Sequence, residues 1–428
     1  QQQTVVLRDA IYTANGVRLA DKGMRIDAAL YERLVNHPLR SPIDEALDLH
    51  DAVDVPTLEA EAMTLCKAAL LPRLLAQTLG PDQEWRLLAP LVDMAWPRQA
   101  SVKLTVMRSQ WPQLYAHSLG MMLVAVYLGV CQGLDDARLG QLAAAALLHD
   151  VGMLYMEPSW ANREHKLTHE ERKQLAVHSI TAMLVVRSMA AYPAEVEMAV
   201  LEHHERMDGS GYPRNITGPH ISELGRILML AEVVAGFFEK YGDERPAMRL
   251  SMMLRLNRQR FDAALTPHVH ALLQRAPDVQ QPLADVQPVA AEVRHSLVML
   301  SMLIDHWKRK SEQLPEKWQL LPSGRAGLFL NVRVASLEAA LAEAGSLPRQ
   351  QMAMLHLMKN DPQMLLEQAA INREALWQLE TCIHACQRRW PQVQQRGDAV
   401  AVAVTEWLNQ AQAVLLGKRP GGRPAFLG

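Results

Sequence analysis

The sequence is poor in cysteine, with four in 428 residues. So few thiols do not form a disulfide framework, which indicates a reducing compartment. The chain does not open with a charged segment followed by an apolar one, so we expect no signal peptide. Its longest strongly apolar run, Leu119 to Cys131, is too short to span a bilayer and predicts a buried helix. Together these absences predict a cytoplasmic protein without a membrane span.

The chain also lacks an excess of charge of either sign. Lys and Arg number 44 and Asp and Glu number 46, which gives a net charge of −2. This balance argues against a protein dedicated to duplex nucleic acid, which would carry a strongly basic surface. Apolar residues make up 49% of the chain, which excludes overall disorder. Small molecules and other proteins are therefore the expected partners, and the length suggests about three domains.

Residues 1–95 predict a small α+β module. Val5–Leu7 and Val17–Leu19 flank an Asn-Gly pair, a pattern typical of a β-hairpin. Residues 27–35 predict a helix, and residues 57–79 predict another that ends at the following Gly-Pro pair. The module has no glycine-rich phosphate-binding loop, and a regulatory role is the working hypothesis for it.

Helical patterns dominate the rest of the chain, so we predict a mainly all-α fold. Residues 96–278 form the predicted central core. Within it, Thr168 and Glu171 make a capping box, which predicts that a helix containing His178 begins there.

A C-terminal helical region is expected over residues 279–416, followed by a flexible tail at residues 417–428. Two one-sided apolar stripes support it. They fit either the core of an ordinary bundle or a surface for a homodimer or a signalling partner. The first stripe is Val289, Val293, Leu297, Leu300, Ile304 and Trp307, and the second is Leu376, Leu379, Ile383, Cys386 and Trp390.

Histidine is concentrated in the predicted core. Seven of the 16 histidines lie between residues 117 and 204, where even spacing would place about three. The strongest pattern is the pair His149-Asp150 after an apolar helix, followed by a second pair, His203-His204. His117, His178 and Glu232 lie on other predicted helices. Because helical metal enzymes gather ligands from separate helices, we expect these side chains to converge.

This donor set is typical of a binuclear metal centre. Neutral imidazole binds borderline divalent metals, and a carboxylate can bridge two ions. Five histidines with Asp150 and Glu232 supply enough donors for two ions, with Fe or Mn favoured, Zn or Ni as further candidates, and Mg²⁺ disfavoured. Two ions about 3.5–4 Å apart lower the pKa of a bridging water and hold phosphate oxygens during in-line attack.

Other histidines and cysteines lack this pattern. His165 and His169 stand among charged residues and are expected to be exposed. Cys382 and Cys386 are spaced i, i+4 on an apolar helix face with His384 between them. That spacing favours packing in a helical core over metal binding.

The two motifs, in this order, resemble the HD-GYP family. His149-Asp150-Val151-Gly152 is similar to its HD motif, and the segment from His203 to Pro213 is similar to its GYP signature. The match covers about residues 112–275. It implies an all-helical HD core with metal-dependent phosphodiesterase activity. The implied substrate is the bacterial messenger cyclic di-GMP, and the implied product is pGpG or GMP.

The resemblance also assigns roles to residues. It implies His149 and Asp150 at the catalytic centre, with Asp150 as the bridge between ions. The implied metal ligands are His117, His149, Asp150, His178, His203, His204 and Glu232, the last in a place where the family usually has Asp. The substrate side is expected at Gly209, Gly211, Tyr212, Pro213, Arg214 and Arg226, where the two arginines would neutralise phosphate.

Three positions depart from the family pattern. Met153 stands where the family commonly has Lys, and a lost donor of this kind removes about 2–3 kcal/mol of transition-state stabilisation. Gln113 replaces a Glu ligand of the three-metal members, so we expect two metals, and Ala235 replaces a later Asp. These departures favour, as an alternative, a catalytically impaired receptor for cyclic di-GMP or a protein-interaction module. Another HD-type nucleotide phosphohydrolase is a further alternative.

Overall fold

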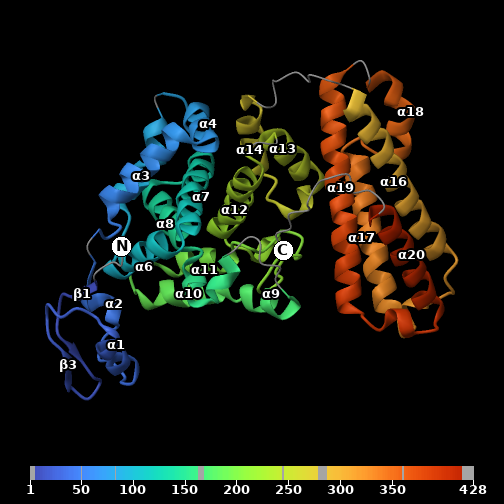
Figure 1. The fold of residues 1–428 in the computed structure, drawn as a ribbon. Helices are drawn as coiled ribbons and strands as arrows, with labels where there is room; N and C mark the ends of the chain where they lie inside the picture. Colours follow the sequence, from blue (N-terminus) through green and yellow to red (C-terminus); the bar gives the residue numbers. More distant parts are fainter. Residues whose placement is uncertain are drawn as a thin grey trace. The chain divides into compact units, whose positions relative to one another are not determined.

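The computed structural model describes residues 5–49, 51–81, 83–161, 168–242, 245–277, 287–358 and 361–416. The chain divides into two compact units, residues 1–242 with 259–275 and residues 243–258 with 276–428 (Figure 1). The fold is mainly all-α, as predicted. The predicted domain boundaries at residues 95 and 278 stay predictions. The predicted tail, His165 and the side chain of His169 lie outside the described residues.

The strands lie in the N-terminal part of unit 1. There β1 (Val5–Leu7) pairs antiparallel with β4 (Leu47–Leu49), and β2 (Ile11–Tyr12) pairs with β3 (Arg18–Ala20). The hairpin around the Asn-Gly pair exists, but our choice of its first strand was wrong. Thr13 closes the hairpin loop, since its N–H donates to the Val17 oxygen at 2.8 Å, and this tight loop leaves β1 to a partner distant in sequence.

Helix α1 (Ala28–Val35) begins as predicted, behind an Asp27 cap. The single helix predicted over residues 57–79 is wrong, because the structure has α3 (Val55–Ala68) and α4 (Leu70–Leu79) with an extended Ala69 between them. Pro72 explains the break. Proline lacks an N–H and is tolerated in the first turn of a helix, so a new start at Leu70 accommodates it. Three more helices precede the core: α2 (Ile43–Ala46), α5 (Ala89–Asp93) and α6 (Arg98–Gln110).

The core of unit 1 is built around α7 (Pro112–Cys131), against which α8 (Asp136–Leu148) and α12 (Glu223–Tyr241) pack. α10 (His178–Ser188) and α11 (Ala194–Glu202) complete the group, with α11 contacting α8, α10 and α12. By length and composition α7 could cross a bilayer, but 78% of its most apolar window is buried inside the protein. The predicted buried helix at Leu119–Cys131 is thus confirmed, while the cytoplasmic location stays a prediction.

Unit 2 is a helical bundle, and both predicted apolar stripes lie largely in its core. Of the first stripe, Val293, Leu297, Leu300, Ile304 and Trp307 are buried, and Cys382 and Cys386 of α19 are buried as well. The two cysteines therefore pack in the core, as predicted. The bundle consists of α13 (Pro246–Leu256), α16 (Gln287–Glu312), α17 (Gly324–Glu343), α18 (Pro348–Met358), α19 (Pro362–Arg389) and α20 (Ala399–Leu416).

Candidate metal centre

The structure brings the predicted ligands together among the core helices of unit 1. His149 and Asp150 directly follow α8, and His203 and His204 directly follow α11. His178 is the first residue of α10. Our prediction that its helix begins at Thr168 was wrong. The capping box at Thr168 is present, but it starts the short α9 (His169–Leu175), after which the chain turns before α10 begins.

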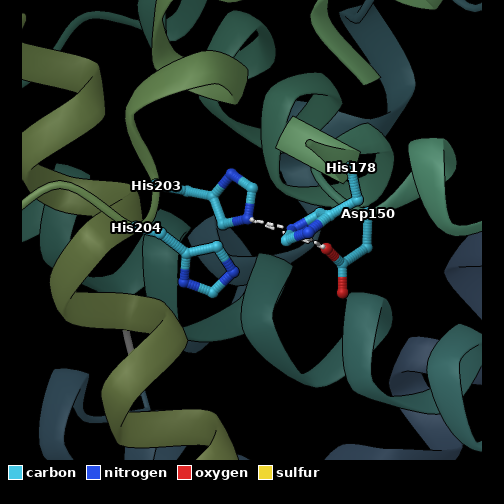
Figure 2. A group of neighbouring side chains, drawn as sticks. All are labelled: Asp150, His178, His203 and His204. Atoms are coloured by element: carbon cyan, nitrogen blue, oxygen red, sulfur yellow. Dashed lines mark hydrogen bonds and ion pairs between the residues drawn. The ribbon is translucent and has the colours of Figure 1, made fainter. Parts of the chain in front are cut away.

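Asp150 joins two groups of potential ligands. One group contains Asp150, His178, His203 and His204, whose donor atoms all lie within 4.8 Å of one another (Figure 2). The other contains His117, His149 and Asp150. The two carboxylate oxygens divide between the groups. Oδ1 lies 3.2 Å from His178 Nε2, and Oδ2 lies 3.3 Å from His149 Nε2. Asp150 therefore faces both groups, with one carboxylate oxygen toward each.

The histidine rings are held with one nitrogen turned to the centre. The Nδ1 atoms of His149, His178 and His203 lie 2.7, 2.5 and 2.6 Å from the carbonyl oxygens of the residues three positions earlier. An Nδ1–H that donates to a carbonyl leaves Nε2 with its lone pair free for a metal. The backbone at the ends of α8, α9 and α11 therefore sets both the tautomer and the direction of these rings.

Two buried polar atoms at the centre lack a hydrogen-bond partner among the described residues, namely His149 Nε2 and Asp150 Oδ1. An unsatisfied buried polar group costs free energy, so such atoms are rare in folded proteins and call for an explanation. Both atoms belong to residues whose chemistry is metal binding. The donor set and the orphaned atoms therefore fit a pair of divalent transition-metal ions.

The electrostatics agree with this fit at Asp150 and His204 but not at every ligand. Against the effect of burial, Glu232 and Glu239 raise the pKa of His117, and Asp150 raises the pKa of His178. Burial alone would raise the pKa of Asp150, but His149, His178 and His203 lower the pKa well below its usual range. Burial and the neighbouring histidines hold the pKa of His204 well below its usual range. An ionised carboxylate next to neutral imidazole is the protonation state that metal binding requires.

Glu232 reaches the second group despite being one methylene longer than Asp. Its Oε2 lies 2.9 Å from His117 Nε2 and 3.6 Å from His149 Nε2. Sequence reasoning missed Glu239, whose Oε1 lies 2.8 Å from His117 Nδ1 and so orients that ring. A signal was present in its spacing, because Glu239 follows Glu232 by seven residues and shares its face of α12.

The GYP loop lies against the same centre. The Tyr212 ring stacks on the His204 ring, with centroids 4.6 Å apart. Gly209 has a positive φ of 73°. At Gly211 a Cβ would lie 2.4 Å from the Glu205 backbone, so only glycine fits. Pro213 follows Tyr212 directly in the loop.

Two buried glutamates hold this loop, and sequence reasoning missed both. Glu205 accepts the Arg214 backbone N–H at 2.7 Å, and Glu202 accepts the Ser222 N–H at 2.8 Å. Both are almost fully buried. Their place directly beside the His pair, at the end of an apolar helix, was the available signal.

The arginines predicted on the substrate side already have carboxylate partners. Arg214 pairs with Glu202, and Arg226 Nη1 lies 2.9 Å from Asp262 Oδ2. Their proposed role toward phosphate stays a prediction.

The three departures from the family pattern lie in different surroundings. Met153 is buried in the 3₁₀ helix Val151–Tyr155 after the HD motif. Ala235 is buried on α12, and Gln113 is exposed on α7 one turn before His117.

Comparison with known proteins identifies this region. Residues 101–265 match the family model of the HD domain. This part of the chain is similar to known HD domains. The predicted resemblance is therefore confirmed, and all the predicted ligands lie inside the HD domain.

Relatives of the HD domain include two named phosphodiesterases. The 3′3′-cGAMP-specific phosphodiesterase 3 of Vibrio cholerae is 30% identical over 159 residues, which cover 36% of this chain and 34% of that protein. The cyclic di-GMP phosphodiesterase response regulator RpfG of Xanthomonas campestris is 34% identical over 112 residues, 26% of this chain and 29% of that protein. The chain thus spans about a third of the length of these relatives.

Among solved structures, Bd1817 of Bdellovibrio bacteriovorus, described as an HDG"Y"P protein, aligns with a TM-score of 0.35 and 12% identity. The alignment covers 63% of this chain and 95% of that one.

Proposed function

We propose that the chain is a metal-dependent phosphodiesterase that hydrolyses a cyclic dinucleotide, with cyclic di-GMP as the first candidate and pGpG or GMP as product. The observation that carries the proposal is the position of Asp150, whose two oxygens face two different histidine groups. The named activities of the relatives, on cyclic di-GMP and on 3′3′-cGAMP, support the substrate class.

In this proposal each predicted metal ligand has a defined task. His178, His203 and His204 would hold one ion, His117, His149 and Glu232 the other, and Asp150 both. A bound pair of divalent ions supplies positive charge for phosphate oxygens and lowers the pKa of water. The carbonyl oxygens behind the Nδ1 atoms keep the rings in place, and the Tyr212 ring covers His204 on the side of the GYP loop. Fe and Mn are the proposed metals.

The test combines metal analysis with turnover on one anaerobically prepared sample loaded with Fe or Mn. Cyclic di-GMP and 3′3′-cGAMP are offered separately, and linear products are separated by chromatography. We expect two equivalents of metal and a linear product. The double variant His149→Ala, Asp150→Ala should lose metal and turnover, while His384→Ala, which changes an exposed histidine of α19, should lose neither. Two bound equivalents without any linear product would contradict the proposal.

A receptor without turnover is the second candidate, and two observations favour it. Met153 offers no donor to phosphate, and Arg214 and Arg226 are already paired with carboxylates. Calorimetry on the same sample separates the candidates, because a receptor binds a cyclic dinucleotide at micromolar concentration and leaves it intact. Preferred turnover of a mononucleotide or phosphomonoester would instead indicate another HD-type phosphohydrolase.

A further inference from the structure

Lys103 of α6 contacts two parts of unit 1 that are distant in the sequence. Its Nζ lies 2.6 Å from Asp44 Oδ2, an atom of α2 in the N-terminal part of the unit. The same Nζ lies 5.3 Å from the centre of the Tyr155 ring, at the end of the 3₁₀ helix that follows the HD motif. The proposed function gives this ammonium group no task.

The ammonium group is better shielded from water than that of an ordinary surface pair. The two paired side chains are 16% and 19% exposed, against 47% and 35% for the surface pair of Lys308 and Glu338 in unit 2. Burial acts to lower the pKa of Lys103, but Asp44 and Tyr155 raise it. A charge that is taken out of water needs such partners, so removing one of them leaves the ammonium group incompletely compensated.

Helix α6 has further contacts with the N-terminal part of the unit. Gln99 Nε2 donates to Glu45 Oε1 at 3.0 Å, and Arg98 Nε donates to the Leu47 oxygen at 2.9 Å. Glu45 belongs to α2, and Leu47 begins β4. A displacement of α2 or β4 would therefore be transmitted to α6 and to its lysine.

The 3₁₀ helix Val151–Tyr155 connects this lysine to the metal ligands. It directly follows Asp150, and α6 packs against it. At Gly152, a Cβ would collide with the backbone of His178, the first residue of α10, so the two backbones are in direct contact. Because the 3₁₀ helix is only five residues long, a shift at its end would displace both of these ligands.

We propose that Lys103 is a positioning residue of the metal centre, which it links to the N-terminal part of the unit through Asp44 and Tyr155. The inference rests on the proposed function and deepens it, because it names how that site would be regulated. With both contacts intact, the 3₁₀ helix holds Asp150 and His178 in place for the ions. A displacement of α2 would weaken the metal site without any direct contact to it.

The experiment measures the Mn(II) affinity of the full chain by competition with a chelator. Asp44→Asn removes the charge on the N-terminal side, and Tyr155→Leu removes the ring on the metal side. Lys103→Met removes the ammonium group, and Lys103→Arg keeps a positive charge. Lys308→Met is the matched control, because it breaks a lysine–carboxylate pair of 2.9 Å in unit 2. The free energy of unfolding is measured for every variant.

For Asp44→Asn, Tyr155→Leu and Lys103→Met we expect the Mn(II) affinity to fall about 3- to 30-fold, as for substitutions that act through a coupled contact. The double variant Asp44→Asn, Lys103→Met should lose no more affinity than Lys103→Met alone, since both remove one contact. Lys103→Arg should recover part of the affinity, and Lys308→Met should match wild type. At saturating Mn(II), kcat on cyclic di-GMP should return toward the wild-type value.

Wild-type Mn(II) affinity in Asp44→Asn and Lys103→Met would overturn the inference, and a loss of unfolding free energy alone would mark a purely structural pair. An affinity that falls in Asp44→Asn but not in Tyr155→Leu would also overturn it, because the link would bypass the 3₁₀ helix. These results leave the proposed function intact. If wild type binds Mn(II) but cleaves no cyclic dinucleotide, the proposed function fails, and the fall in affinity still supports the inference.

Discussion

Two groups of buried polar side chains, one in each unit, differ in whether their hydrogen bonds are complete. In unit 2, Gln368 and Asn372 of α19 are buried, but they bond to each other at 2.8 Å, and Asn372 also donates to Ser296 of α16 at 2.8 Å. In unit 1, His149 and Asp150 are held just as firmly, yet each keeps a buried atom without a hydrogen bond among the described residues. The first network is complete within the protein, and the second is not.

This difference separates a structural polar network from a ligand site. Buried polar groups normally find partners, because leaving one unpaired costs about 1–3 kcal/mol. Unit 2 also has orphaned atoms, His306 Nδ1 and Trp307 Nε1, but neither residue belongs to a group of metal donors among the described residues. A site is therefore indicated where orphaned atoms and a cluster of ligand-type residues coincide, which in this chain is at Asp150.

Removing the bridge should produce the largest effect. Asp150→Asn keeps one carbonyl oxygen but loses the negative charge that both ligand groups share. We expect both ions to be lost and turnover to fall by at least about 10³-fold, as when a group is required for metal-assisted attack. Metal analysis and product assays on the same sample measure this. Retention of two equivalents of metal would show that Asp150 does not join the sites.

The core of unit 2 should respond in stability and not in metal binding. Trp407 is fully buried, packs edge-on against Trp307 and donates to the Leu303 oxygen at 2.9 Å. Trp407→Ala should destabilise unit 2 by about 3–5 kcal/mol, because it leaves a large cavity. Denaturant unfolding gives this value, and metal content should stay at the wild-type level. A parallel loss of metal would break the contrast between the units.

A substitution at Glu239 tests whether the carboxylate that contacts the ligand His117 strengthens metal binding. Glu239→Gln removes the charge that faces His117 Nδ1 and should weaken metal binding about 10- to 100-fold, as is typical for the partner of a ligating histidine. Competition with a chelator of known affinity measures the change. Glu338→Gln, which alters a surface carboxylate paired with Lys308 in unit 2, is the matched control and should leave the affinity unaltered. Equal metal affinities in both variants would show that Glu239 does not contribute to the metal site.

Asn372 should show the smallest effect. Asn372→Ala leaves the Gln368 amide without its acceptor in the core and should cost about 1–3 kcal/mol of unfolding free energy. Metal affinity and turnover should remain at their wild-type values. If Asn372→Ala altered either of them, the network of unit 2 would not be purely structural.

The ligands could be predicted because they are rare residue types in adjacent pairs. His149-Asp150 and His203-His204 follow apolar helices, where packing alone does not explain two imidazoles and a carboxylate. Glu239 could not be singled out in the same way, since carboxylates are common on helix surfaces. Its contact with the site depends on the orientation of the His117 ring, which the sequence does not reveal. The partners of Arg214 and Arg226 were equally hidden, because ion pairs between distant residues depend on the fold.

Local structure was predicted less well where two patterns compete. Val5–Leu7 and Ile11–Tyr12 are both apolar enough to form the first strand of the hairpin, and only the tight loop at Thr13 decides between them. The break at Ala69 depends on Pro72, which an otherwise continuous helical pattern conceals. The apolar stripes of α16 and α19 had no such competitor, and the structure buries them largely as expected.

The bridging role of Asp150 is the central claim, and magnetic coupling between bound ions tests it most directly. The anaerobic protein is loaded with Mn(II), and its electron paramagnetic resonance spectrum is recorded beside that of Asp150→Asn. A carboxylate that bridges two ions about 3.5–4 Å apart should give an exchange-coupled signal at two equivalents in wild type, and this signal should be absent from the variant. Two uncoupled ions in wild type, or binding of a single ion, would contradict the account.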